Sequence, residues 1–294
     1  MDTLQDIDLK TLTKKSFWKS SAYIFLDISI LFCILIVAWQ TDNIAITLVA
    51  ILLIARQQNA LGVLAHEASH LNLYKSKNAN LFIGRAFMGA CLGISFDAYK
   101  HAHFLHHKHM MTKKDPDLVF IEKFPIAKNK LWLQFLPDLL GLSWLYLNLY
   151  YLNYARKNKI ALVTVIASLV PGLIWHIGLI SLCFMAGKWW FYFLYWVLPM
   201  TTLVPMFMHI RGICEHAGRE PSRDAFRGAR SVKKNGLAML VAPHNYNYHV
   251  EHHLVSNVPH YNIPRLHKSL KENEYYCKEA FAANYREAIE KLIV

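Results

Sequence analysis

Cysteine is scarce in this 294-residue sequence, and its few thiols are scattered. No two of the five cysteines form a C-x-x-C pair, so the spacing argues against a disulfide framework and against a thiolate metal site. We expect small buried side chains at these positions, which are Cys33, Cys91, Cys183, Cys214 and Cys277. The sequence also lacks a G-x-G-x-x-G turn after a strand, which argues against a fused dinucleotide-binding module.

Repeats, low-complexity tracts and Ser/Gly-rich linkers are also missing. We therefore predict a single domain over residues 1–294. No secretory signal peptide is expected, because the first 20 residues are largely polar and the first apolar run is too long for a signal sequence. Insertion into a membrane would then rely on that apolar run itself.

Hydrophobic side chains are abundant instead, at 54% of all residues, which is high for a soluble domain of this size. Four apolar runs are long enough to cross a bilayer, and they pair into two hairpins. The four predicted spans are residues 22–39, 44–64, 161–186 and 189–208. Polar residues 56–59 interrupt the second run, so either Arg56 reaches toward the membrane surface or this helix leaves the bilayer early.

Two further apolar stretches, residues 81–95 and 131–153, are not predicted to cross the bilayer. The first is short and contains Arg85, and the second contains Pro137, Asp138 and many tryptophans and tyrosines, which suits the headgroup layer. If either stretch crossed the bilayer, the histidine clusters described below would lie on opposite sides. We therefore predict re-entrant or interfacial helices at both places.

The net charge of +12 is distributed unevenly along the sequence. With four spans and both termini on one side, the outer turns are residues 40–43 and the neighbourhood of Lys188. Of the 32 lysines and arginines, Lys188 alone falls in these turns. Cytoplasmic loops of membrane proteins carry an excess of lysine and arginine, so the pattern predicts cytoplasmic termini. It also explains the positive net charge without a role in nucleic-acid binding.

Three histidine clusters lie outside the centres of the predicted spans. H-E-A-S-H places two histidines at i and i+4, and H-F-L-H-H and H-V-E-H-H each place three at i, i+3 and i+4. On a helix, residues at these spacings leave from one face within about one turn. The clusters consist of His66 and His70, of His103, His106 and His107, and of His249, His252 and His253.

Eight imidazoles exceed what one transition-metal ion can bind, and His216, just past the last predicted span, is a plausible ninth. We therefore predict that the clusters meet around two metal ions. Two alternatives stay open. H-E-A-S-H alone fits a zinc-protease pattern with Glu67 as general base, although the other clusters are then unexplained. A single H-x-x-H-H could also be a solvated basic face.

Other polar residues are predicted to support this centre rather than to bind metal. His176 lies within a predicted span, where we expect a neutral, hydrogen-bonded ring. Asp115 and Asp117 either hydrogen-bond a ligand or cap a turn. Supporting, capping or surface roles are also expected for His101, His109, His209, His244, His260 and His267. Three glutamates beside predicted ligands are expected to accept from a second ring nitrogen: Glu67, Glu215 and Glu251.

The three clusters in this order, the four-span layout and the tail N-Y-H-V-E-H-H-L followed by P-H-Y-N-I-P-R-L-H resemble the membrane-bound fatty acid desaturases and their hydroxylase relatives. The resemblance covers about residues 44–270. It implies an all-α multipass membrane protein, with four transmembrane helices in two hairpins, interfacial helices, and a cytoplasmic helical region that carries a non-haem di-iron site. The metal ligands would be His66, His70, His103, His106, His107, His249, His252 and His253, with His216 as an additional ligand.

The resemblance also implies an activity, namely oxygen-dependent desaturation of a fatty acyl chain or a related lipid. Two iron ions would be the cofactor and dioxygen the co-substrate, and a lipid hydroxylase or ketolase on the same centre is the alternative. Electrons would come from a separate ferredoxin- or cytochrome-type donor with its reductase. We expect a bacterial inner membrane, or otherwise the endoplasmic reticulum. One departure is Gly212, where animal acyl-CoA desaturases carry asparagine, so a water-linked ligand there is not expected.

Overall fold

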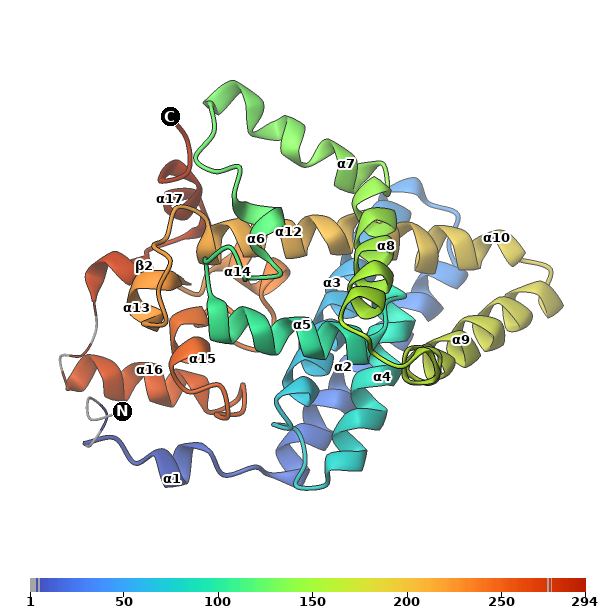
Figure 1. The fold of residues 1–294 in the computed structure, drawn as a ribbon. Coiled ribbons are helices and arrows are strands. Elements are labelled where there is room, and N and C mark those ends of the chain that lie inside the picture. The colour runs from blue at the N-terminus through green and yellow to red at the C-terminus, as the bar shows by residue number, and fades with distance from the viewer. Residues whose placement is uncertain (1–3, 5, 274, 276) are drawn as a thin grey trace.

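The structure, a computed structural model, describes residues 4, 6–273, 275 and 277–294, and its regular elements are almost all helices. The strands of the described part are two short segments, β1 (Ser231–Val232) and β2 (Phe281–Ala282), which pair in parallel. The predicted all-α class is therefore confirmed (Figure 1). The single-domain boundary stays a prediction.

Four helical segments are long and apolar enough to cross a membrane, as the sequence predicts. The first three are α2 (Phe17–Trp39), α3 (Ile44–Ser69) and α9 (Leu162–Met185). The fourth runs from Trp189 to His216 and contains α10 (Trp189–Tyr192), a π-helical turn η4 (Phe193–Val197), α11 (Leu198–Thr201) and α12 (Leu203–His216). Two of these segments extend beyond the predicted spans and carry histidines at their C-terminal ends.

The polar interruption of the second apolar run does not end its helix. The amide of Asn59 donates to the Val241 carbonyl at 2.9 Å, and Arg56 lies 3.6 Å from the Asp27 carboxylate of α2. A polar side chain can lie inside a helix bundle when it is paired in this way. As a result α3 continues to Ser69 and carries its buried histidine into the interior of the protein.

The stretch predicted to be re-entrant forms α4 (Lys77–Leu92), which packs against α3 and α9. After Gly93, whose φ of 72° suits glycine, the chain turns by 100° into α5 (Phe96–His109). Gly89 of α4 and Gly172 of α9 meet backbone to backbone, which lets these helices pack closely. This bend brings α5 back toward the C-terminal end of α3 (Figure 1).

The second stretch without a predicted span is broken into short pieces, none of which is among the four long apolar segments. The elements between residues 118 and 157 are α6 (Leu118–Ile121), η2 (Lys128–Lys130), η3 (Trp132–Gln134), α7 (Leu136–Leu139) and α8 (Leu142–Lys157). The short α1 (Leu9–Leu12) precedes α2. The C-terminal region contains α13 (Ala225–Gly228), α14 (Gly236–Val241), α15 (His249–Leu254), α16 (Ile263–Glu272), η5 (Lys278–Ala280) and α17 (Tyr285–Glu290).

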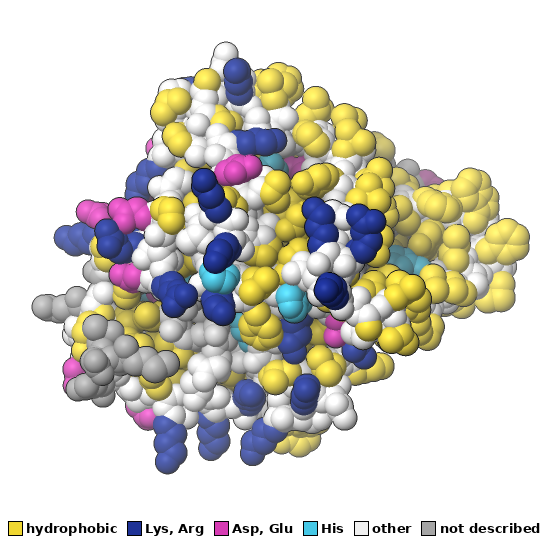
Figure 2. Space-filling model, in the orientation of Figure 1, with side chains coloured by type: hydrophobic (Ala, Val, Ile, Leu, Met, Phe, Trp, Pro, Cys, Tyr) yellow, Lys and Arg dark blue, Asp and Glu magenta, His cyan; other side chains and the backbone are white. Residues whose placement is uncertain are grey.

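Exposed hydrophobic side chains gather on the long helices. Leu162, Phe184 and Met185 of α9 are each more than 70% exposed. Figure 2 shows hydrophobic side chains over α9 and α10 on the right, whereas lysines and arginines gather on the rest of this face. Such contiguous apolar surface is typical of contact with lipid. The helices and this surface together support membrane association.

Candidate metal centre

All nine histidines predicted as ligands come together in two groups. The five-histidine group contains His66, His70, His103, His107 and His252, and the four-histidine group contains His106, His216, His249 and His253. Within each group, the nearest ligand atoms all lie within 4.8 Å of one another. The two groups adjoin, because the rings of His107 and His253 have centroids 4.3 Å apart.

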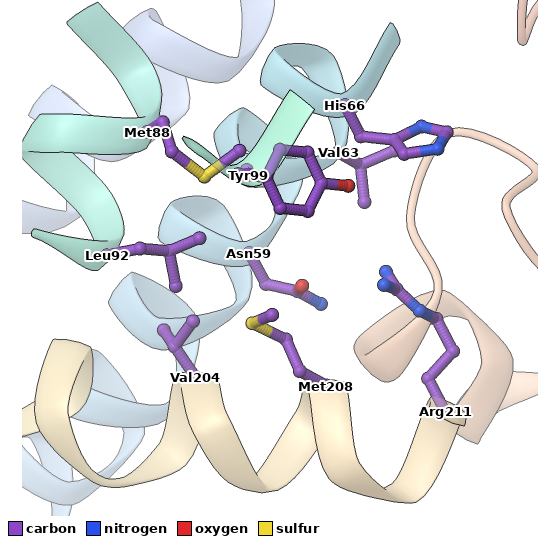
Figure 3. Close-up of a pocket in the computed structure, with 10 residues that line it drawn as sticks. Asn59, Val63, His66, Met88, Leu92, Tyr99, Val204, Met208 and Arg211 are labelled. Carbon is purple, nitrogen blue, oxygen red and sulfur yellow. The ribbon is translucent and has the colours of Figure 1, made fainter. Parts of the chain in front are cut away.

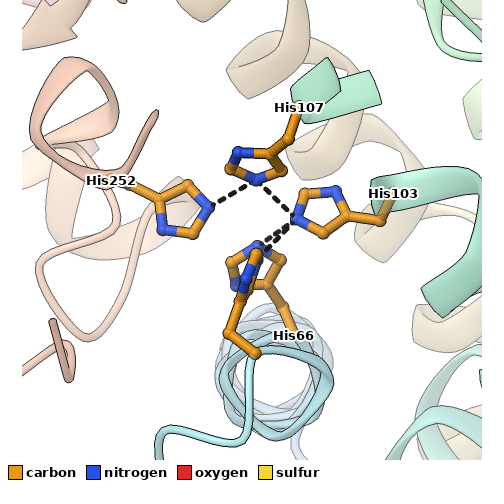
Figure 4. Close-up of side chains that lie close together, drawn as sticks. His66, His103, His107 and His252 are labelled. Carbon is orange, nitrogen blue, oxygen red and sulfur yellow. Dashed lines mark hydrogen bonds between the residues drawn. The ribbon is translucent and has the colours of Figure 1, made fainter. Parts of the chain in front are cut away.

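The five-histidine group is centred on the Nε2 atom of His103, which α5 carries. Three other Nε2 atoms lie 2.8, 2.9 and 3.0 Å from it, those of His66, His70 and His107. His252 of α15 completes the group, with its Nε2 3.1 Å from that of His107. Figure 4 shows these rings, which come from three parts of the chain, pointing toward a common centre.

This crowding fits a shared metal ion better than a hydrogen-bond network. A neutral imidazole nitrogen carries either one hydrogen or one lone pair, so His103 Nε2 cannot satisfy three such contacts by hydrogen bonding. Ligand nitrogens at right angles and about 2.1 Å from one ion lie about 3.0 Å from each other. The observed spacings of 2.8–3.0 Å around His103 agree with this value.

The four-histidine group shows the same spacing. The Nε2 atom of His249 lies 2.7 Å from that of His216 and 3.0 Å from that of His253. The ring of His106 packs against those of His216 and His253, with centroids 4.7 and 5.0 Å away. Because α12 supplies His216, the last apolar segment is connected directly to this group.

Each H-x-x-H-H cluster divides its histidines between the two groups. In α5, the i and i+4 residues His103 and His107 join the five-histidine group, and the i+3 residue His106 joins the other. In α15 the assignment is reversed, because His249 and His253 join the four-histidine group and His252 joins the five-histidine group. One helical turn at each place therefore contributes to two sites.

Burial favours the neutral form of the imidazoles in the five-histidine group, and this form can bind a cation. Burial lowers the pKa of His70 to about 3, and the charge of Lys100 adds to this effect. Burial and the neighbouring histidines also lower the pKa of His103, His107 and His252 well below the usual range. Neutral rings keep a lone pair for a metal, and imidazole suits iron, copper, nickel and zinc.

The fatty acid desaturase family model matches residues 42–283, which is most of the chain. The protein belongs to this family.

Curated relatives agree with this assignment and differ among themselves in activity. The chain is 25% identical to the dihydrorhizobitoxine desaturase of Bradyrhizobium elkanii, over 79% of this chain and 69% of the relative. It is 26% identical to the beta-carotene ketolase of Paracoccus sp. (strain PC1), over 79% and 84%, respectively. A second Paracoccus beta-carotene ketolase, from strain N81106 / MBIC 01143, is 24% identical over 69% and 71%. The protein is thus an oxidoreductase of the desaturase and ketolase type that modifies lipids.

Among the described residues, hydrogen bonds between the second ring nitrogen of a ligand and a protein oxygen are found in the four-histidine group. The Nδ1 atom of His106 lies 2.9 Å from an Asp115 carboxylate oxygen, and that of His216 donates to the Gly228 carbonyl at 3.1 Å. Although burial alone would lower the pKa of His106, the bond to Asp115 and the nearby charge of Asp117 raise it. Such bonds fix the tautomer and leave Nε2 free for a metal.

Two of the three glutamates predicted to support ligands lie beside them, but at longer distances. A carboxylate oxygen of Glu215 is 3.4 Å from His249 Nδ1, and one of Glu67 is 3.7 Å from His66 Nδ1. Glu251 instead contacts His267 and accepts from the Ser231 hydroxyl at 2.6 Å. These two contacts connect α15 to α16 and to β1, so the Glu251 carboxylate supports the packing of α15 and does not orient a ligand ring.

The seven other histidines, among them His101 and His109, lie outside both groups. His209 contacts Asp138 at 2.9 Å, and His244 contacts Asp27 at 2.6 Å, so both act as partners of buried carboxylates. His176 contacts the Tyr192 hydroxyl at 2.9 Å, which agrees with the hydrogen-bonded ring expected there. His260 and His267 are buried near the C-terminal cluster.

A narrow cavity adjoins the five-histidine group at His66. Its other lining residues are Asn59, Gly62, Val63, Met88, Leu92, Tyr99, Val204, Met208 and Arg211, from α3, α4, α5 and α12 (Figure 3). The sequence analysis did not single out Tyr99 or Arg211. Tyr99 lies four residues before His103, so the helical spacing could have placed it beside the metal centre.

Proposed function

We propose that this protein catalyses the oxygen-dependent desaturation of a fatty acyl chain or a related lipid at a pair of iron ions. Nine histidines would hold the ions, five in one group and four in the other. The observation that carries this proposal is the convergence of nine imidazoles, six buried and three partly buried, beside a partly apolar cavity. Neutral nitrogen ligands suit iron, although they do not distinguish it from other transition metals.

With iron bound, the centre would supply an oxidant strong enough to break unactivated C–H bonds, which amino-acid side chains cannot do. The overall balance converts one CH₂–CH₂ unit, one dioxygen molecule, two electrons and two protons into one CH=CH unit and two water molecules. The protein itself orients the ligands: Asp115 holds the Nδ1 hydrogen of His106 so that Nε2 faces the centre. Val63, Met88 and Leu92 line the cavity with apolar groups and exclude water from the reacting carbons.

The proposed arrangement in the membrane places both termini and the metal centre on the cytoplasmic side. This topology follows from the positive-inside pattern, in which Lys188 alone lies in an outer turn. A bacterial inner membrane is the proposed location. Electrons would come from a separate ferredoxin- or cytochrome-type donor with its reductase, and a basic cytoplasmic face would favour an acidic donor.

A ketolase or hydroxylase activity on the same centre is the second candidate. The observation that favours it is the similarity to two beta-carotene ketolases, one of which the chain covers over 84% of its length. The zinc-protease alternative has less support. His66 and His70 share their group with three further histidines, whereas a zinc protease of this pattern combines its two histidines with one further ligand.

Metal analysis and product analysis test the proposal together. We expect about two irons and little zinc per purified chain, because nine imidazoles are divided between two groups. Expression in a host of simple lipid composition, followed by mass spectrometry, should reveal lipids that have lost two hydrogens. Lipids that have gained oxygen instead would establish the ketolase or hydroxylase candidate. One zinc per chain with no lipid product would contradict both.

A further inference from the structure

The helix α2 carries none of the nine histidines, yet its one acidic side chain contacts the segment that leads into α15. Asp27 lies within α2 and is 3% exposed. Its carboxylate lies 2.6 Å from the Nε2 atom of His244, which belongs to the segment formed by residues 242–248. A carboxylate inside a membrane-spanning helix costs free energy, so we searched for a role that its contacts support.

Three side chains surround the Asp27 carboxylate at different distances. His244 is the nearest, followed by the Gln57 amide nitrogen at 3.3 Å and the Arg56 guanidinium group at 3.6 Å. Gln57 also donates to the Asp27 backbone carbonyl at 3.0 Å. The carboxylate therefore joins α2 and α3 to the segment 242–248.

The backbone of this segment adopts an uncommon conformation. His244 and Asn245 have φ angles of 58° and 62°, in the left-handed region that residues other than glycine rarely occupy. Such a backbone persists only where surrounding contacts determine it. One of these contacts is the bond from the Asn245 amide to the His260 carbonyl, at 3.2 Å. The contact between His244 and Asp27 is another.

Tyr246 connects the segment 242–248 to both histidine groups. Its buried ring packs against His66 of α3, with centroids 4.6 Å apart. It also packs against His249 and His252 of α15, with centroids 5.5 and 5.7 Å away. His66 and His252 belong to the five-histidine group, whereas His249 belongs to the four-histidine group. The position of the Tyr246 ring therefore affects how the ligands of α3 and α15 face each other.

We propose that Asp27 and His244 are positioning residues of the metal centre, because they hold the segment that places Tyr246 against ligands of both groups. Among the described residues, neither forms a hydrogen bond or a ring contact with any of the nine histidines, so their effect passes through Tyr246. Ligand geometry depends on side chains that lock the ligand rings by packing. This inference rests on the proposed function, since it concerns the metal centre of that activity.

A role limited to compensating the charge of Arg56 fits the distances less well. The contact between Asp27 and His244 lies within hydrogen-bonding distance, whereas the 3.6 Å between Asp27 and Arg56 does not. Arg56 also contacts the side-chain oxygen of Gln57, so it has a second partner. The geometry therefore favours His244 as the partner that Asp27 holds.

Cobalt(II) binding to the full-length protein in detergent tests the inference without turnover. The visible absorption of bound cobalt(II) depends on the geometry of its ligands, so it reports on the positions of the rings. We expect Asp27→Leu and His244→Leu each to shift this absorption and to weaken cobalt binding about tenfold. His244→Gln should restore most of the wild-type spectrum and affinity, because its amide can still donate to Asp27.

Further variants separate positioning from general stability. Leu35→Ala removes a buried side chain farther along α2, so it should lower the Tm without changing the cobalt spectrum. Tyr246→Leu removes the ring itself and should change the spectrum as Asp27→Leu does. When these two substitutions are combined, their effects should not add, since both act through the same contact. If Asp27→Leu does not fold, His244→Leu decides, because His244 lies outside the four long apolar segments.

Four results would overturn the inference: no cobalt binding by the wild type, an unchanged spectrum and affinity in every folded Asp27 and His244 variant, the same spectral change in Leu35→Ala, or additive effects with Tyr246→Leu. The expected spectral changes in a protein that oxidises no lipid would support the positioning role and count against the proposed activity. Lipid desaturation that is undiminished in Asp27→Leu and His244→Leu, with unchanged spectra, would show the reverse. The failures of the two proposals are therefore distinguishable.

Discussion

The two histidine groups are held in place in different ways. In the four-histidine group, His106 and His216 each hydrogen-bond a protein oxygen through the second ring nitrogen. Among the described residues, the buried Nδ1 atoms of His66 and His252 in the five-histidine group have no hydrogen-bond partner, and the same holds for His249 in the four-histidine group. Hydrogen bonds thus orient two of the four rings in the first group, whereas the second group relies on ring packing and on an additional ligand.

This difference matches the positions of the groups relative to the cavity. His66 lines the cavity, and Tyr99, which stacks on His103, lines it as well. The four-histidine group lies farther from it, next to Asp115 and the Gly228 carbonyl. We infer that the five-histidine group faces the substrate, and that the four-histidine group is the more rigid of the two.

Removal of the central ligand should have the largest effect. His103→Ala deletes the nitrogen that three other ligands approach, so we expect turnover to be lost and metal content to fall by about one ion per chain. Turnover assays and metal analysis measure both. His101→Ala is the matched control on the same helix, because this exposed ring contacts, among the hydrogen-bonding groups of the described residues, only the Tyr154 hydroxyl. Full metal content in His103→Ala would contradict the assignment.

Removal of a carboxylate that lies beside the second ring nitrogen of a ligand should lower the metal affinity of the two groups unequally. Asp115→Asn weakens the bond that orients His106, so metal affinity of the four-histidine group should fall about 10- to 100-fold. Glu67→Gln should change metal affinity less, because the carboxylate lies 3.7 Å from His66. Chelator competition monitored by metal release measures both. Equal losses in the two variants would show that the groups are supported alike, and complete inactivity of Glu67→Gln with one zinc bound would favour the protease alternative.

Most of the metal centre could be predicted from the sequence, because histidines at helical spacing carry their own geometric information. All nine predicted ligands meet in the structure. The division between the groups could not be predicted, since it depends on how α5 and α15 face each other. His106 and His252 both occupy the i+3 position, yet they belong to different groups.

The fold shows the same limit. Hydropathy located the four long apolar segments, but it did not predict that α3 would continue through Arg56 to Ser69. That continuity depends on partners distant in the sequence, such as Asp27 and the Val241 carbonyl. The hydrogen-bond partners of the ligand histidines could also be predicted only in part. Asp115 was a candidate by its position, whereas the Gly228 carbonyl carries no signal in the sequence.

A change at the contact between α4 and α9 should perturb both histidine groups together. Of the three predictions, this one has the smallest expected effect. A Cβ atom on Gly172 would lie 2.4 Å from the Gly89 backbone, so Gly172→Ala should push α4 and α9 apart and destabilise the protein by about 1–3 kcal/mol. Thermal unfolding in detergent measures this loss. Because α4 leads directly into α5, which supplies ligands to both groups, metal affinity should fall in both alike.

Gly178→Ala is the matched control on the same helix. A Cβ atom there would meet nothing within 4 Å, so this substitution should leave stability unchanged or raise it by up to about 1 kcal/mol through better helix propensity. If Gly172→Ala behaved like this control, the close approach of the two helices would not matter for the metal centre. If it weakened one group selectively, α5 would respond as two independent parts. The expected equal loss instead means that one rigid helix sets the geometry of both groups, whatever hydrogen bonds lie behind each ring.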